Sequence, residues 1–225
     1  MPGWIHSTIT IDAAVREHVY LIGVELHGIT VKEKDEAILQ ELQREEAELR
    51  RQYHSPAEAR ERFEPARWLY RSLGVDPTRT RPSSEALMRR ILQGKGLYQV
   101  NSVVDGFNLL SIRLALPVGL YDTDHVVPPV ILRKGAAGES YPGIGKASIN
   151  LEGRLCLADQ EGPFGNPSAD SARTRIRMDT QNVLAVFFVP VIVELDHARQ
   201  RLHACTEFVE RFIQPVSSTP FLLHP

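Results

Sequence analysis

The sequence predicts an α+β fold, with strands and helices in separate stretches of the chain. Apolar, β-branched runs at residues 4–11 and 19–31 are typical of two early strands. Residues 32–63 are instead dense in Glu, Arg, Gln and Ala, which are strong helix formers. After Pro117, short apolar or alternating runs separated by Gly-rich turns indicate a series of strands. With 225 residues, the chain is long enough for one large domain with a self-sufficient core.

The charged stretch at 32–63 predicts a surface helix that breaks at the Ser55-Pro56 step. Its apolar positions form only a narrow stripe, which leaves most of the helix circumference in water. The stripe consists of Ile38, Leu39, Leu42 and Leu49. A coiled-coil partner would need apolar heptads that persist, and these do not. We therefore expect the helix to pack on its own domain rather than on a partner helix.

Three shorter helices are expected before Pro117. The first covers Arg67–Leu73 and is ended by a glycine. The second is capped by Ser83 or Ser84, and the third runs from 106 to about 115.

The strand-like runs after Pro117 are residues 126–134, 146–151, 154–159 and 182–195. The last run does not alternate, which predicts a central strand over Val183–Val193 that is buried on both faces, with Pro190 at a bulge or edge. Asp196 then caps a final amphipathic helix that extends to about Ile213.

Composition and charge exclude several classes of protein. The formal net charge is −2, which excludes a globally cationic nucleic-acid coat but not a local basic patch. Cys156 and Cys205 are too few for a disulfide scaffold and fit a reducing compartment. The N-terminus lacks a signal-peptide pattern, and the longest apolar run is about half of the roughly 20 residues that span a bilayer. We expect a cytoplasmic protein that does not bind membranes.

Signatures of cofactor and metal sites are missing from the sequence. It contains neither a Walker phosphate loop nor a dinucleotide fingerprint. Its eight histidines do not fall at metal-ligand spacing, since His197 and His203 are six residues apart on one expected helix. We therefore predict no cofactor and no metal site.

Basic residues gather in three stretches of the chain. The first contains Arg79, Arg81, Arg89, Arg90 and Lys95, the second Arg133 and Lys134, and the third Arg173, Arg175 and Arg177. Guanidinium groups match phosphate oxygens well, so each group is a candidate site for phosphates. If its segment is extended, the third group would present its side chains on one side of a strand. The alternative for each group is a solvated, charged face without a ligand.

Residues 80–190 carry an ordered set of short motifs. They are Val103-Val104-Asp105 with Asn108, Leu116-Pro117-Val118 with Tyr121-Asp122-Thr123-Asp124, Leu132-Arg133 with Gly138-Glu139, Leu157-Ala158-Asp159, and Thr180-Gln181-Asn182-Val183-Leu184. In order and spacing they resemble the B3/B4 domain of the phenylalanyl-tRNA synthetase β subunit, and still more the free-standing B3/B4 proteins. The resemblance implies a three-layer β/β/α sandwich over residues 66–225, with residues 1–65 as an N-terminal strand and helix extension packed on the core.

In the synthetase, this domain hydrolyses tRNA that carries the wrong amino acid, chiefly tyrosine. The resemblance therefore implies tRNA or aminoacyl-tRNA, and not DNA, as the partner. With such a partner, we predict that the first basic group holds the RNA backbone. Asn108 matches an asparagine that lines the pocket for the aminoacyl end, and Asp105 matches the aspartate before it. The chain departs from the family at Phe107, which replaces a threonine, and at Gly119, which replaces a histidine. Gly165–Ser171 replaces the loop that recognises the tyrosine hydroxyl.

Within this resemblance, each pocket residue has a candidate role. Asn108 would orient the ester or the amino group, and backbone N–H groups near Gly119 or Gly165 would serve the oxyanion. Asp170 or Asp105 would bind the substrate α-ammonium group.

Each of these residues also has a structural alternative. Asp105 can cap a helix, Asn108 can cap or bond within the core, and Asp170 and Ser171 can belong to a solvated loop. If the carried-over site is right, one pocket should bring together Asn108, Gly119, Arg133 and the Gly165–Ser171 loop.

Three functions fit the sequence. The first is a free-standing deacylase that hydrolyses mischarged aminoacyl-tRNA in trans, with no residue assigned as catalytic. The second is a non-catalytic module that binds an amino acid, a nucleoside or a tRNA end. The third is an interaction protein whose N-terminal helices dock a partner.

Overall fold

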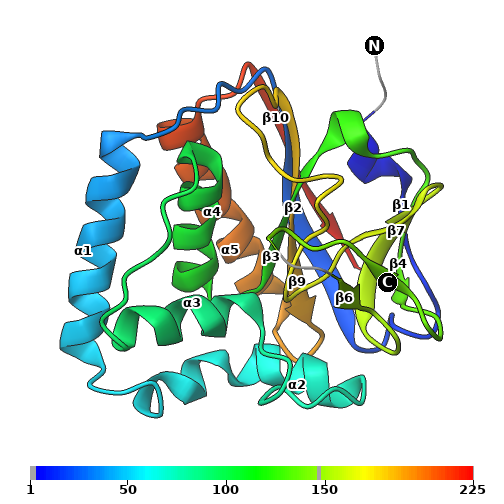
Figure 1. Cartoon of the computed structure of the whole chain (residues 1–225), viewed down its shortest axis with the longest axis horizontal. Coiled ribbons are helices and arrows are strands. Elements are labelled where there is room, and N and C mark those ends of the chain that lie inside the picture. Colours follow the sequence, from blue (N-terminus) through cyan, green and yellow to red (C-terminus); the bar gives the residue numbers. More distant parts are fainter. Residues whose placement is uncertain (1–3, 146–147, 225) are drawn as a thin grey trace.

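The computed structural model describes residues 4–145 and 148–224, which fold into three layers. Figure 1 shows a layer of helices, a central sheet beside it, and a second sheet on the opposite side. Apolar side chains fill both interfaces, one between the helices and the central sheet and one between the two sheets. The predicted α+β class and the implied β/β/α layering are confirmed.

The central sheet has the strand order β10-β2-β9-β3 and is antiparallel throughout. Its strands are β2 (Val19–His27), β3 (Val118–Asp122), β9 (Asn182–Pro190) and β10 (Ser217–Leu223). Side chains of β9 alternate between the two interfaces, so that Phe187 packs with the helices and Phe188 with the second sheet. Because both faces are covered, the run is apolar without alternation. The predicted central strand is confirmed up to Pro190, and the next three residues lie outside it.

The second sheet has the strand order β1-β4-β7-β8. Its strands are β1 (Ile9–Ile11), β4 (Val130–Lys134), β7 (Leu155–Asp159) and β8 (Gly162–Gly165), and a small two-stranded sheet pairs β5 (Ser140–Tyr141) with β6 (Ile149–Asn150). The first expected strand was too long, because Ile5–Thr8 forms a 3-10 turn. In the expected run at 146–151, the first two residues lie outside the described part of the chain.

The helix layer contains α1 (Glu36–Gln52), α3 (Ser83–Leu92), α4 (Ser102–Leu114) and α5 (Leu195–Phe208), which continues as a π-helical turn to Ile213. The narrow apolar stripe of α1 is buried within this chain, as predicted. The chain breaks near Pro56 into a 3-10 turn (Glu58–Phe63) and then α2 (Glu64–Ser72). In Figure 1, α2 lies along the bottom of the molecule.

Three helix starts differ from the sequence-based expectation. Asn101 caps α4 by accepting a hydrogen bond from the Val104 N–H, so this helix begins four residues earlier than expected. Neither Ser83 nor Ser84 caps α3, because helical geometry follows directly after Pro82 and both hydroxyl groups lack a partner. Asp196 lies inside the first turn of α5, where it pairs with an arginine of the same turn.

Residues before 66 contribute strands to both sheets. β2 is an interior strand of the central sheet, paired with β9 on one side and β10 on the other. β1 adds the edge strand of the second sheet. Apolar side chains from residues before 66 are therefore part of both core clusters.

Among the described residues, no helix combines the length and hydropathy that crossing a bilayer would require.

Candidate functional site

A groove of about 370 Å³ lies along α3. It is lined by Arg81, Ser83, Ala86, Leu87, Arg89, Arg90, Gln93, Lys95, Tyr98, Asn108 and Ser168. Four of these side chains are cationic and none is a carboxylate, so the surface of the groove is positive. Arg79 is exposed in the loop before α3 and is not among the lining residues.

The groove takes its shape from the way α3 ends. Arg89 and Arg90 lie in the last turn of the helix. Gly94 and Gly96 follow with φ of 76° and 63°, a left-handed conformation that glycine adopts without strain, and they reverse the chain. Tyr98 then lies beside the helix, with its ring centroid 3.6 Å from the Arg90 guanidinium carbon. This cation–π contact fixes one wall of the groove.

Asn108 of α4 and the loop after β8 complete the groove. Asn108 is half-buried on α4, and Ser168 comes from the Gly165–Ser171 loop. The structure thus brings one predicted pocket residue and part of a predicted loop together with four of the five predicted RNA-backbone residues.

Gly119, Gly165 and Asp170 also converge, but around a side chain that the sequence analysis did not single out. A Cβ atom on Gly119 would lie 1.8 Å from the Tyr121 hydroxyl oxygen, and one on Gly165 would lie 2.2 Å from it. The fully buried Tyr121 side chain therefore fills the space between these two strands. The role expected for N–H groups near the glycines, which was to face a ligand, is not supported by this packing. In the sequence, Tyr121 stands out only as a member of a motif shared with the family.

Asp170 lies next to Tyr121 with little access to water. Its Oδ2 accepts a hydrogen bond from the Leu120 N–H at 3.2 Å, and its Oδ1 is buried without a hydrogen-bond partner. Burial raises the pKa of this carboxyl to about 7. Asp170 is therefore a buried carboxyl and does not line the groove.

Asp105 and Phe107 both lie away from the groove. Asp105 is buried in the first turn of α4, where its carboxylate accepts from the Val100 N–H at 2.9 Å. Burial raises the pKa of Asp105. Phe107 is wholly buried and packs on Phe187 between the helices and the central sheet. Neither side chain lines the groove.

Arg133 and Ser171 are engaged in local contacts of the second sheet and its loops. Arg133 donates two hydrogen bonds of 2.7 Å to Glu139, which lowers the pKa of that carboxyl. Ser171 is buried, and its hydroxyl accepts from the Arg173 N–H. Neither residue lines the groove, so the single pocket expected from the resemblance divides into separate places.

The third basic group, which consists of Arg173, Arg175 and Arg177, does not lie in a strand. Arg173 is held in an irregular segment, where its guanidinium bonds to Asp159 at 2.8 Å. The expected common side for the three arginines is therefore wrong. Among the described residues, no cluster of three or more His, Cys, Asp or Glu side chains is arranged to hold a metal ion.

Comparisons with known proteins agree with the resemblance. The phenylalanine–tRNA ligase beta subunit of Geobacter metallireducens is 29% identical over 141 residues, which cover 58% of this chain and 17% of that protein. The same subunit of Leifsonia xyli subsp. xyli is 28% identical over 145 residues, covering 62% of this chain and 17% of that protein. The chain thus matches only a small part of the length of these curated relatives.

A solved structure and a family model give two further matches. The N-terminal fragment of the phenylalanyl-tRNA synthetase beta subunit from Pyrococcus horikoshii is 15% identical, with a TM-score of 0.48, over 91% of this chain and 48% of that one. The sequence model described as "B3/4 domain" matches residues 66–221, from α2 to β10. Since this match spans more than half of its residues, the chain belongs to the B3/4 domain family.

Proposed function

We propose that the protein binds the aminoacyl end of tRNA in the α3 groove and hydrolyses mischarged aminoacyl-tRNA in trans, in the cytoplasm. One observation carries the proposal: the groove places Asn108 among Arg81, Arg89, Arg90 and Lys95 on one concave surface. A tRNA end must be held by its phosphates before its aminoacyl group can be inspected, and such contacts position the substrate without reading bases. Membership of the B3/4 domain family and similarity to phenylalanine–tRNA ligase beta subunits support the same class of substrate.

Hydrolysis of an aminoacyl ester requires few catalytic groups in the groove. An aminoacyl ester is reactive, so positioning the ester and polarising its carbonyl group accelerate its hydrolysis. The Asn108 amide can donate to the ester carbonyl or accept from the substrate amino group, because it carries both functions. It is partly exposed at the wall of the groove.

Hydrolysis is tested on a panel of mischarged tRNAs. We expect the wild-type chain to accelerate deacylation of at least one of them, and Asn108→Ala to reduce that rate by at least tenfold while tRNA binding changes less than twofold. Equal rates with and without the protein over the whole panel would contradict the catalytic part of the proposal.

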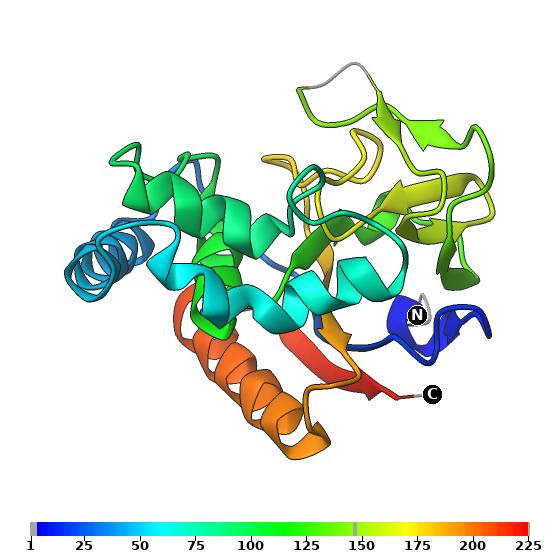
Figure 2. The same ribbon diagram turned by 90° about the horizontal axis from the view of Figure 1, so that it is seen from below.

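Binding is tested by measuring tRNA affinity against salt concentration. Arg89→Glu/Arg90→Glu should weaken binding at least tenfold and reduce the slope of log K against log salt by about 1 for each phosphate that the protein no longer neutralises. The matched control is Arg199→Glu/Arg211→Glu, which reverses two exposed charges on the helix at the far side of the helix layer (Figure 2). Equal affinity for wild type and the α3 variant would exclude the groove as the RNA site.

A non-catalytic binding module is the second candidate. It is favoured by the side chains of the groove, because no histidine or carboxylate among them can serve as a general base. This candidate predicts salt-dependent tRNA binding without faster deacylation. A partner docked on the N-terminal helix has less support, because the apolar stripe of α1 is already buried within the chain.

A further inference from the structure

Tyr98 is an aromatic side chain that the fold holds in place but leaves in water. It is 61% exposed and lies between α3 and α4, in a segment without regular secondary structure. The residue before it anchors this segment. The Leu97 side chain packs against two apolar clusters, and its N–H donates to Glu46 Oε1 at 2.8 Å. Because so little of the Tyr98 ring is buried, its contribution to the core is small.

The Tyr98 ring has one covered face and one open face. The Arg90 guanidinium carbon lies 3.6 Å from the ring centroid, so the cation covers the first face. The residue is mostly exposed, so the opposite face is open to water. Arg89 and Lys95 line the same groove. The groove therefore combines an open aromatic face with cationic side chains.

A single-stranded nucleic acid matches this combination. Proteins bind unpaired strands by stacking bases on aromatic side chains while cationic groups follow the backbone. Unpaired ends of RNA expose the faces of their bases, which paired strands hide within the helix. The groove volume of about 370 Å³ lies in the range of roughly 300–1,000 Å³ that is typical of small-ligand sites. The groove thus has room for a nucleotide.

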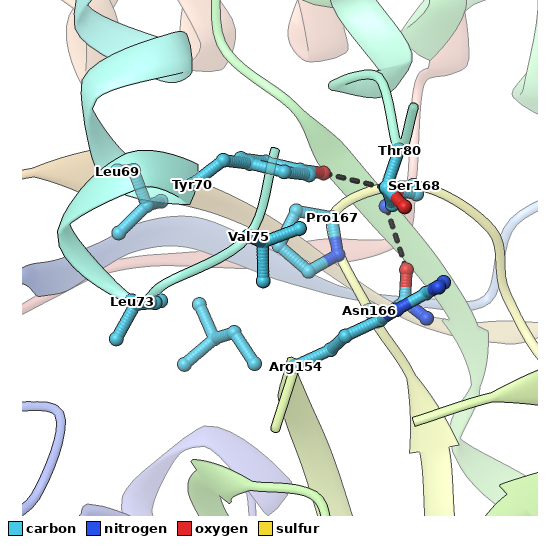
Figure 3. Close-up of a pocket in the computed structure, with 10 residues that line it drawn as sticks. Leu69, Tyr70, Leu73, Val75, Thr80, Arg154, Asn166, Pro167 and Ser168 are labelled. Carbon is cyan, nitrogen blue, oxygen red and sulfur yellow. Dashed lines mark hydrogen bonds between the residues drawn. The ribbon is translucent and has the colours of Figure 1, made fainter. Parts of the chain in front are cut away.

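A second cleft, next to the groove, is too small for a base. Figure 3 shows this cleft, in which the Tyr70 hydroxyl forms a hydrogen bond of 2.6 Å with the Ser168 hydroxyl. Its volume is about 20 Å³, and on this measure one buried water needs roughly 10–15 Å³. Ser168 lines both places, so the cleft and the groove are neighbours. Of these two tyrosines, Tyr70 is buried and bonded within the chain, whereas Tyr98 faces the larger site.

We propose that Tyr98 stacks on one base of the unpaired 3′ end of a tRNA bound in the α3 groove, so that Arg90, Tyr98 and the base form three layers. The inference rests on the proposed tRNA-binding function and adds a contact with a base to the contacts with phosphates. Every base has an aromatic face, so this stack selects an unpaired end rather than a sequence.

Transcripts of tRNA in which one of the last three nucleotides is abasic test the stack. We expect at least one of these three changes to weaken binding to the wild-type chain at least fivefold, because a stacked base contributes that much or more. In Tyr98→Leu, the same change should alter affinity less than twofold, and intact tRNA should bind at least fivefold more weakly than to wild type. Tyr98→Phe keeps the ring and should behave like wild type.

Salt dependence separates stacking from an indirect role of Tyr98. Tyr98→Leu removes no cation, so the slope of log K against log salt should stay unchanged. A slope reduced by about 1, with abasic tRNA still bound more weakly than intact tRNA, would show that Tyr98 only holds Arg90 in place and would overturn the proposal. Ile192→Ala, at an exposed apolar residue outside the groove, is the control and should bind like wild type.

The two proposals fail in different ways. Absence of tRNA binding by the wild-type chain would overturn the proposed function together with the stack. Normal tRNA binding with equal affinity for intact and all three abasic transcripts would overturn the stack alone. Thermal unfolding confirms that each variant is folded.

Discussion

At the scale of single residues, Asp170 couples the stability of the fold to pH. Its folded pKa of about 7 lies above the value of about 3.9 expected in the unfolded chain. Between these two values the folded state keeps the proton and the unfolded state releases it. The contribution of this carboxyl to stability is therefore complete below about pH 4 and is lost as the pH rises to about 7.

Replacement by asparagine should remove this pH dependence. We expect the free energy of unfolding of Asp170→Asn, relative to wild type, to rise by on the order of 2 kcal/mol between pH 5 and pH 8. Urea denaturation at a series of pH values measures it. Asp179→Asn, at an exposed aspartate, should run parallel to wild type. A parallel curve for Asp170→Asn as well would show that the buried carboxyl does not titrate in this range.

Glu25 ties the N-terminal turn to the central sheet. Its fully buried carboxylate accepts from the Ile5 N–H at 2.9 Å, the His6 N–H at 2.8 Å and the His6 ring at 2.8 Å. Glu25→Gln removes the charge and one acceptor oxygen, so we expect a loss of about 1–3 kcal/mol of stability. Hydrogen exchange should become faster at the amides of residues 5 and 6. Glu17→Gln, at an exposed site, is the control, and equal exchange in the two variants would refute the anchoring role.

At the scale of the elements, Gly23 lets the central strands approach one another. A Cβ atom at this position in β2 would lie 2.2 Å from the Ala185 carbonyl oxygen and 2.5 Å from the Phe221 ring. A backbone oxygen cannot move aside as a flexible side chain can. We expect Gly23→Ala to lower the free energy of unfolding by at least about 2 kcal/mol.

The comparison variant for this prediction is Gly74→Ala. Gly74 has a φ of 82° but open space around its Cα, so alanine there meets only backbone strain, worth about 1 kcal/mol. Chemical denaturation measures the free energy of unfolding of both variants. A smaller loss for Gly23→Ala than for Gly74→Ala would mean that the sheet accommodates the added methyl group.

At the scale of the whole molecule, the segment that matches the family model cannot close the core alone. A fragment of residues 66–225 lacks β2, so β9 and β10 would lose the strand that lies between them. Their backbone groups and the apolar faces of both interfaces would then be exposed. We expect the fragment to show no cooperative thermal unfolding by circular dichroism, while the full chain does. A sharp transition in the fragment would establish residues 66–225 as an independent domain.

Local patterns in the sequence determined several parts of this molecule. The four-residue stripe of α1, the unbroken apolar run of β9 and the glycines after α3 each follow from periodicity or backbone conformation within a few residues. The gathering of Arg89, Arg90 and Lys95 was also predictable, because these residues are neighbours in one helix and its terminal turn. The motifs shared with the B3/4 domain family predicted the layered fold.

Only the tertiary structure decided which side chains meet across layers. Strand β3 is short and pairs with β9, which is distant in the chain, so local propensity does not reveal it. Strand β8 is a four-residue strand with two glycines and a proline, residues that are depleted in strands. The two strands belong to different sheets, and the packing of these sheets places Tyr121 between Gly119 and Gly165, where a pocket was expected. Arg133 forms an ion pair with Glu139, whereas no ion pair in the described residues involves Arg154. A charge is free to bind a ligand only where the fold leaves it without a partner, and that depends on contacts between segments that the sequence alone does not bring together.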